Sequence, residues 1–491
     1  MQTDRNEAEG PQLAERVRGA VFWRSGSQIV AQAFSWGSTL LVVRLLDPSD
    51  YGLFAMSQVV LLFLMFLSGH GFASALIQAD KVEPLRVRQA FGMLLLLNGG
   101  IALIQVAIAP YMADYYGQPM VGEMLRWQAL NYLVTPFSVI PEVLLTRRLQ
   151  FKVPALITIA TTALGAAVAV TLALWGAGVW TLVVAPAVIF WSRAILLVWT
   201  TRFFILPTFD FRGAGSIFAF GSTLLAGHFF WVVQTQADVF IAGRVLDPHA
   251  LGLYAEALFL TQIFAARFVP PLNEVAFPAY ARMQKEKEKL AASFLTAVRL
   301  IMLLALPLYL GLAVSAGPAV ATLFGPKWLE MAPLVAVIAL AMPLMTLQIL
   351  FAPALNALGM PRITARISLF GAVLMPSAFL IGVQYGAEGL AWAWVAAYPL
   401  LAFFTYTQAR RHIGIDLRGI GQAIAPSLSA ALPMAALVWI VRESLPPMPA
   451  PAELGILIAV GALCYAGLLK LTAPRLIEEV ARIFVRRRAP A

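Results

Sequence analysis

The sequence has very little of what most metal sites and disulfide-stabilised folds require. Its 491 residues include one cysteine, Cys464, within an apolar run, and only four histidines. A lone cysteine excludes a disulfide framework, a cysteine zinc site and an iron–sulfur cluster made by this chain alone. The histidines His70, His228, His249 and His412 are not spaced as metal ligands. We therefore expect neither a metal nor a cofactor.

Charged residues are also scarce, since only 12% of the chain is charged while 60% is apolar, and the mean hydropathy is +0.80. These values predict a polytopic membrane protein. The formal net charge of +10 could suggest nucleic acid, but Lys and Arg concentrate in alternate loops. That pattern is explained by the positive-inside rule, so no nucleic-acid partner is expected.

Two kinds of machinery are missing from the chain. There is no Gly-Lys-Ser or Gly-Lys-Thr loop that could hold ATP phosphates. The loops between predicted spans are at most about 15 residues long when windows of about 20 apolar residues are used, too short for the external domain of a membrane-bound glycosyltransferase. We therefore expect a transporter driven by a gradient or by its substrate, not an enzyme.

The apolar windows predict an all-α integral membrane protein with about 14 transmembrane helices, the first near 18–43. One span is expected over 330–357, and tight hairpins near residues 176 and 386. The predicted organisation is a cytoplasmic N-terminal segment (1–17), an N-terminal six-helix lobe (18–201), a cytoplasmic linker (202–213), a C-terminal six-helix lobe (214–409), a helical pair (419–473) and a basic cytoplasmic tail (474–491).

The two lobes are related by an internal repeat. Residues 44–55, Arg-Leu-Leu-Asp-Pro-Ser-Asp-Tyr-Gly-Leu-Phe-Ala, return at 244–255 as Arg-Val-Leu-Asp-Pro-His-Ala-Leu-Gly-Leu-Tyr-Ala. Each copy predicts an Arg at a helix C-terminus, followed by Asp-Pro as N-cap and first residue of the next helix. An even number of spans per repeat makes the copies parallel, with a cleft between the lobes and alternating access by rocking.

The orientation follows from the same loops. Basic residues crowd alternate loops and the C-terminal tail, whereas the opposite side has only Arg44, Arg244, Lys327 and Arg442. The positive-inside rule therefore predicts that both termini are cytoplasmic.

Polar stripes on the first and seventh predicted spans are the candidates for a shared substrate cavity. At equivalent repeat positions, Gln28 corresponds to His228 and Ser35 to Thr235. Hydrogen bonding between helices is the alternative explanation, and for Arg24 so is snorkelling. The cavity candidates of the two stripes are Arg24, Gln28, Gln32, Ser35, Thr39, His228, Trp231, Gln234 and Thr235.

Ionisable residues inside spans are costly and mark function. Asp238 is the candidate for coupling to a proton or sodium ion. Arg267 suits a diphosphate or an acidic sugar because its guanidinium offers paired donors; a buried ion pair that holds helices together is the alternative, although neither Glu256 nor Glu274 is at ideal helical spacing from it. Charged residues nearer span ends are expected to snorkel or to serve helix ends, namely Arg126, Glu142, Arg193 and Arg299. An interfacial belt is expected for the tryptophans at 175, 180, 191, 199, 392 and 394.

Several segments carry a family resemblance. They are Phe-Val-Pro-Pro-Leu-Asn at 268–273, Phe-Pro-Ala-Tyr-Ala-Arg-Met-Gln at 277–284, Glu-Lys-Leu at 288–290, Phe-Gly-Pro-Lys-Trp at 324–328 and the Arg-Leu-Leu-Asp-Pro segment of the repeat. With these segments the chain resembles the Wzx-type lipid-linked oligosaccharide flippases. More narrowly, it is similar to the colanic-acid-exporter type of polysaccharide transporter within the multidrug/oligosaccharidyl-lipid/polysaccharide exporter superfamily.

The resemblance implies a two-lobed transporter of the bacterial inner membrane. It would turn an undecaprenyl-diphosphate-linked glycan from the cytoplasmic to the periplasmic leaflet, with the lipid tail left in the bilayer. A polysaccharide polymerase and export machinery are the implied protein partners. The alternative is a cation-coupled drug or small-molecule antiporter on the same fold.

Overall fold

The computed structural model describes residues 3–65, 84–147, 150–211, 230 and 232–474, and in its first helix the side chains from Trp23 onward except Arg24. The chain divides into two compact units. The first comprises residues 1–232 with 247–249, and the second 233–246 with 250–491. Each unit is a bundle of helices, and the described residues contain no strand. The lobe and linker boundaries expected from the sequence stay predictions.

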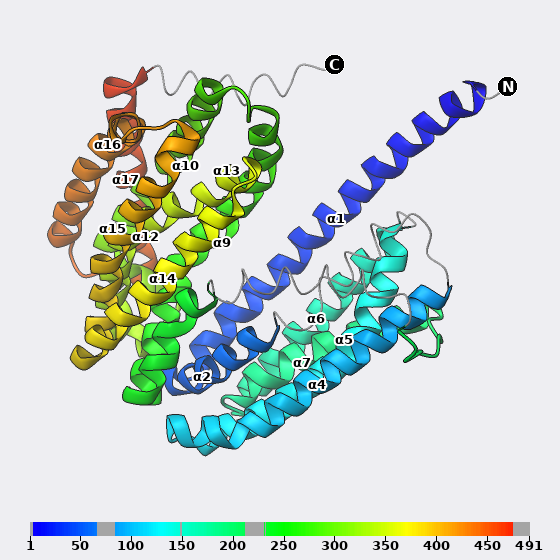
Figure 1. Cartoon of the computed structure of the whole chain (residues 1–491). Helices are drawn as coiled ribbons and strands as arrows, with labels where there is room; N and C mark the ends of the chain where they lie inside the picture. Colours follow the sequence, from blue (N-terminus) through cyan, green and yellow to red (C-terminus); the bar gives the residue numbers. More distant parts are fainter. Residues whose placement is uncertain (1–2, 66–83, 148–149, 212–229, 231, 475–491) are drawn as a thin grey trace. The chain divides into compact units, whose positions relative to one another are not determined.

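The described part of the first unit is a bundle of helices (Figure 1). α4 packs along α5, α6 lies between α1 and α7, and α5 contacts both α2 and α7. The bounds are α1 (Thr3–Leu45), α2 (Pro48–Met65), α4 (Pro84–Tyr116), α5 (Pro119–Arg147), α6 (Lys152–Leu174) and α7 (Trp180–Thr201).

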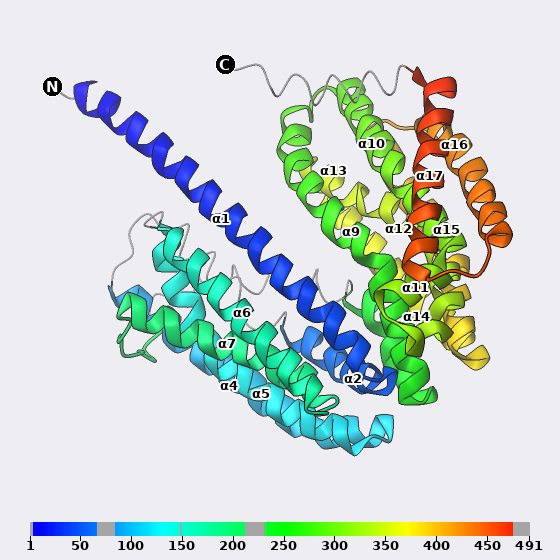
Figure 2. The same cartoon turned by 180° about the vertical axis from the view of Figure 1, so that it is seen from behind.

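The second unit is seen from behind in Figure 2. The helical segment over residues 232–245 belongs to it from residue 233 onward. α10 packs against α12 and α16, α15 against α12 and α14, and α17 against α11 and α16. The bounds are α9 (Pro248–Arg282), α10 (Lys287–Val314), α11 (Ala316–Leu323), η2 (Pro326–Met331), α12 (Ala332–Ile349), α13 (Phe351–Ala357), α14 (Pro361–Gly382), η3 (Val383–Tyr385), α15 (Gly386–Ile413), α16 (Leu417–Ser444) and α17 (Ala450–Thr472).

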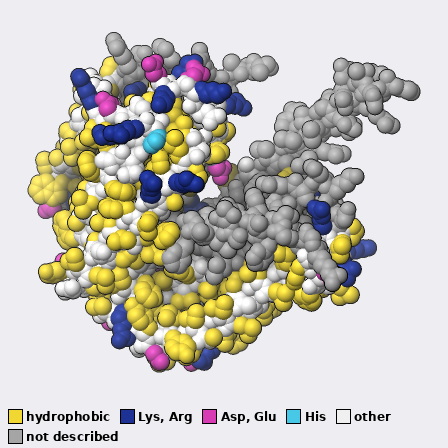
Figure 3. Space-filling view, viewed as in Figure 1, with side chains coloured by type: hydrophobic (Ala, Val, Ile, Leu, Met, Phe, Trp, Pro, Cys, Tyr) yellow, Lys and Arg dark blue, Asp and Glu magenta, His cyan; other side chains and the backbone are white. Residues whose placement is uncertain are grey.

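The helices have the length and polarity of membrane spans. Eleven helical ranges among the described residues are long and apolar enough to cross a bilayer, and one of them, Pro361–Ile413, holds both α14 and α15. Apolar side chains cover much of the described surface in Figure 3, and many Lys and Arg side chains gather at the upper end of the second unit. The all-helical membrane fold is therefore confirmed.

The repeated segment forms a helix-to-helix turn in both copies. Arg44 lies in the last turn of α1, and α2 begins at Pro48. Asp50 accepts a hydrogen bond from the backbone N–H of Asp47 at 3.2 Å. In the second copy Asp247 caps α9 by accepting from the backbone N–H of His249 at 2.9 Å. The predicted turn is confirmed, and its Asp-Pro pair fixes where each helix starts.

The start of the predicted linker is tied to the first unit. The backbone N–H of Thr208 donates to the carbonyl of Arg88 at 3.1 Å. The Nε of Arg88 donates to the carbonyl of Leu206 at 3.0 Å, and Gln89 donates to the carbonyl of Asp210 at 2.9 Å. Phe203 is buried in the same core as Phe91. Residues 203–211 thus form a strap along α4.

The expected hairpins are present, and two helices differ from expectation. Gly176 and Gly386 adopt positive φ angles of 75° and 74° at the tight turns. The span expected over 330–357 lies within one range long and apolar enough to cross a bilayer, Pro326–Ala357. Its helix is interrupted between Ile349 and Phe351, because Pro353 has no N–H to donate to the carbonyl of residue 349. α1 is helical from Thr3, well before residue 18.

Candidate functional site

A buried polar cluster lies inside the second unit, where the segment 232–245 meets α9 and α15. Asp238 is only 1% exposed. The hydroxyl of Tyr254 donates to Oδ2 of Asp238 at 2.9 Å, and Nε1 of Trp394 donates to the hydroxyl of Tyr254 at 2.8 Å. Oδ1 of Asp238 has no hydrogen-bond partner among the described residues. A carboxyl group inside a membrane span is costly, and such a group marks function.

Aromatic rings and one amide hold this cluster in place. Trp394 stacks on Tyr398, with ring centroids 5.3 Å apart. Gln234 is buried and contacts the hydroxyl of Tyr398. Gly371 of α14 leaves room for the Gln234 side chain, because a Cβ at position 371 would collide with it. The cluster therefore has little freedom to rearrange without moving α14 or α15.

The two repeat copies differ at this cluster. Asp238 corresponds to Ser38 and Tyr254 to Phe54 in the first copy. Tyr254 was not a sequence candidate, although its hydroxyl is what distinguishes it from the otherwise matching Phe54. Trp394 was expected in an interfacial belt, but it is 1% exposed and bonded to Tyr254. The carboxyl–tyrosine pair thus belongs to the second copy alone.

The stripe on α1 lies in the first unit. Gln28 and Ser35 are exposed, whereas Gln32 and Thr39 are half-buried. The side chain of Arg24 lies outside the described ones. Of the second stripe, Gln234 is buried and Thr235 half-buried, while His228 and Trp231 lie outside the described residues. A cavity formed by the two stripes stays a prediction.

Arg267 lies on α9, three residues before Pro270. Its side chain is exposed, and the structure records no ion pair between it and a described carboxylate. The alternative of a buried ion pair that holds helices together is therefore not seen among the described residues. Within the described part of the chain, no group of three or more His, Cys, Asp or Glu side chains could hold a metal ion.

One ion pair of the first unit differs from expectation. Nη2 of Arg193 on α7 donates to both carboxylate oxygens of Glu142 on α5, at 2.9 and 3.0 Å. Nη1 donates to the hydroxyl of Thr158 on α6 at 2.9 Å. Snorkelling or a helix-end role was expected for both charged residues. Instead, their side-chain hydrogen bonds link α5, α6 and α7. Residue spacing along one helix could not indicate these contacts between helices.

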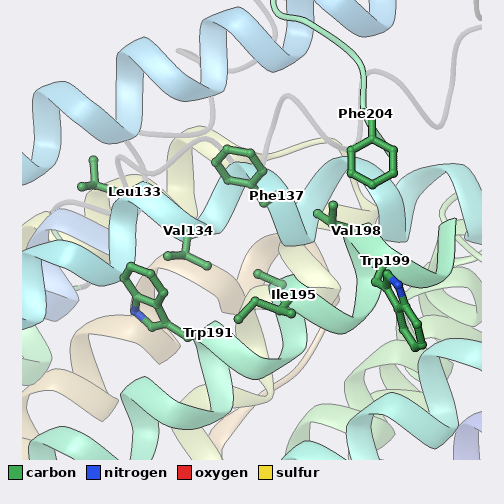
Figure 4. A pocket seen from close by; sticks show the side chains of 9 residues that line it. Leu133, Val134, Phe137, Trp191, Ile195, Val198, Trp199 and Phe204 are labelled. Carbon is green, nitrogen blue, oxygen red and sulfur yellow. The ribbon is translucent and has the colours of Figure 1, made fainter. Parts of the chain in front are cut away.

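An apolar pocket of about 520 Å³ lies between α5 and α7 (Figure 4). Val134 and Phe137 line it from α5, and Trp191 and Trp199 from α7. The indole Nε1 of Trp191 already donates a hydrogen bond to Oδ1 of Asn131 at 3.2 Å. The pocket therefore offers almost no polar group to orient a charged ligand.

Solved structures show the fold. The chain is similar to the lipid II flippase MurJ in its inward closed conformation, with a TM-score of 0.74 and 11% identity. The match covers 92% of this chain and 99% of that one.

Curated relatives match over almost the whole length. The succinoglycan biosynthesis transport protein ExoT of Rhizobium meliloti (strain 1021) is 25% identical, covering 97% of this chain and 98% of ExoT. The teichuronic acid biosynthesis protein TuaB of Bacillus subtilis (strain 168) is 23% identical, covering 96% of this chain and 99% of TuaB. Residues 41–333 match the family model described as "Polysaccharide biosynthesis protein". Because that match spans more than half of the chain, the protein belongs to this family of polysaccharide biosynthesis proteins.

Proposed function

We propose that the protein is a flippase that carries lipid-linked oligosaccharide units across a membrane for polysaccharide biosynthesis. The observation that carries this proposal is its likeness, over nearly its full length, to the transport protein ExoT and to the fold of the lipid II flippase MurJ. Many apolar helices and short connections suit a carrier whose substrate keeps its lipid tail in the bilayer.

In more detail, the substrate is a glycan on undecaprenyl diphosphate, moved from the cytoplasmic to the periplasmic leaflet of a bacterial inner membrane. Transport proceeds by alternating access. The exposed guanidinium of Arg267 supports a role in binding the diphosphate, since Arg offers paired donors to phosphate oxygens. A polysaccharide polymerase and export machinery receive the product.

The test uses proteoliposomes that contain the purified protein and a fluorescent lipid-diphosphate-linked oligosaccharide. Protein-dependent exposure of the glycan to an external glycosidase is the expected result. Liposomes without protein and liposomes with heat-inactivated protein set the background rate. A rate equal to that background would contradict the proposal.

Ion coupling is assigned to Asp238. Three observations support this role. The carboxyl group is buried, it accepts a hydrogen bond from the hydroxyl of Tyr254, and its Oδ1 has no hydrogen-bond partner among the described residues. We expect Asp238→Asn to remove any response of transport to a pH or sodium gradient. The amide oxygen can still accept from Tyr254, so the fold is kept. A gradient response unchanged in Asp238→Asn would remove this role.

A cation-coupled antiporter on the same fold is the second candidate, because a buried membrane carboxyl group also suits a cation. The proteoliposomes distinguish the two when they are loaded with a cationic dye. Dye movement without glycan exposure would favour the antiporter. Glycan exposure without dye movement is the result we expect.

A further inference from the structure

We propose that a neutral pocket inside the first unit, between α2, α5 and α7, binds one sugar ring of the glycan through its hydroxyl groups. The identity of the ligand rests on the flippase function proposed above. The pocket itself is defined by side chains of one unit.

The pocket has a volume of about 200 Å³. This is below the roughly 300–1,000 Å³ of sites for drug-sized ligands, so it suits a single ring and not a whole oligosaccharide. Its polar lining is Gln58 from α2 with Gln128, Asn131, Tyr132 and Thr135 from α5. α7 and α2 supply apolar lining that includes Phe190 and Phe54.

Gln128 is the strongest sign of a ligand. It is 3% exposed, and its Nε2 donates to the hydroxyl of Ser57 at 3.3 Å. That bond leaves Oε1, which has no hydrogen-bond partner among the described residues. A buried acceptor without a donor costs about 1–3 kcal/mol. Because the Gln128 side chain lines the pocket, a turn of its amide would let a ligand hydroxyl donate to Oε1 and remove that cost.

Asn131 presents the complementary group. Nε1 of Trp191 can only donate, so it must face Oδ1 of Asn131, as observed at 3.2 Å. This contact fixes the amide orientation and leaves Nδ2 as a donor. No described residue accepts from it. The pocket therefore offers an oriented donor and an unpartnered acceptor from the same helix.

The chemistry of the lining selects the ligand class. None of the described residues that line the pocket is charged, so a diphosphate or an acidic sugar would find no counter-ion there. An alkyl chain would leave the amides unsatisfied, whereas the neighbouring pocket beside Trp191 is almost entirely apolar. A neutral sugar has hydroxyls that both donate and accept, and an apolar ring face for Phe54 and Phe190.

The first experiment compares Gln128→Leu with Gln105→Leu in the proteoliposome assay. Gln105 of α4 is a matched control, because it is equally buried, donates to the carbonyl of Leu125 at 2.7 Å and also has an unpartnered Oε1, but it does not line the pocket. Each variant is tested with a lipid diphosphate that carries a neutral oligosaccharide, scored by an external glycosidase, and with the same lipid diphosphate without sugar, scored by an external phosphatase.

We expect Gln128→Leu to slow movement of the glycan-bearing lipid by about tenfold, the effect of one lost hydrogen bond, with no change for the bare lipid diphosphate. Gln105→Leu should change the rates of movement of the two substrates to the same extent. Equal loss on both substrates, or no loss, would overturn the inference. Absence of flipping by the unaltered protein would instead overturn the proposed function.

A second experiment does not depend on transport. Leu62 lines the pocket without contributing a polar group, so Leu62→Cys in a Cys464→Ala background keeps every amide. We expect a neutral alkyl glycoside to slow the reaction of the introduced thiol with a membrane-permeant maleimide, and the matching alkanol not to. Protection by the alkanol would assign the pocket to a lipid chain, and lack of protection by either would assign it no ligand. Both outcomes overturn the inference.

Discussion

At the scale of single residues, the hydroxyl of Tyr254 is the centre of the buried cluster in the second unit. It donates to Asp238 and accepts from Trp394, and all three side chains are at most 1% exposed. Tyr254→Phe leaves a carboxylate oxygen and an indole N–H without this partner. We expect the free energy of unfolding in detergent to fall by about 1–3 kcal/mol. Denaturant or thermal unfolding of the purified variant measures this.

Tyr111→Phe is the matched control, because Tyr111 is 71% exposed. We expect it to change stability by less than about 0.5 kcal/mol. Equal stabilities for the two variants would show that the hydroxyl of Tyr254 does not hold the cluster together. The sequence pointed to Asp238 but not to this partner, since the two lie on different helices.

At the scale of elements, the strap over residues 203–211 depends on a glycine. A Cβ on Gly92 would collide with the carbonyl oxygen of Thr208, while Gly99 on the same helix has open space around it. Gly92→Ala should therefore detach the strap from α4, and Gly99→Ala should not. We expect trypsin to cleave after Arg202 at least about tenfold faster in Gly92→Ala, because local unfolding exposes the chain.

Equal cleavage of the two alanine variants would contradict the packing of the strap. A protease comparison suits this question because an alanine in a helix interior is itself stabilising relative to glycine by up to about 1 kcal/mol. Gly99→Ala therefore reports the helix effect alone. Faster cleavage in Gly92→Ala then reports the loss of strap contacts.

The elements themselves could largely be predicted from the sequence, because each depends on local chemistry. Asp247 marks a helix start because its side chain caps α9, Asp50 accepts from the backbone N–H of Asp47 at the start of α2, and Gly386 marks a turn through its positive φ. The strap could not be predicted, since it depends on carbonyl groups meeting α4, more than 100 residues earlier. The same holds for Arg193 and Glu142, which lie on separate helices.

At the scale of the whole molecule, the family and the transporter class follow from composition, the repeat and the motifs at 268–284 and 324–328. The composition of the site does not follow, because residues that share a pocket come from several helices. Gln128 and Asn131 were not sequence candidates. A periodic apolar pattern locates spans, but it does not say which amide loses its partner when spans pack.

The predicted orientation of the whole chain has a direct test in the second unit. Lys285 precedes the start of α10, and Ser444 ends α16. The C-terminal ends of these helices meet, since Arg442 donates to the carbonyl of Val314 at 3.0 Å. α10 has 28 residues, a length of about 42 Å at 1.5 Å per residue, so the two positions lie at opposite ends of the bundle.

With cytoplasmic termini, Lys285→Cys is cytoplasmic and Ser444→Cys periplasmic. In a Cys464→Ala background, we expect a membrane-impermeant maleimide applied to intact spheroplasts to label Ser444→Cys and to leave Lys285→Cys unlabelled until the membrane is opened. The reverse pattern would invert the orientation and the proposed direction of transport. Labelling of both from outside would contradict the membrane crossing of α10 and α16, because one span cannot present both of its ends to the same side.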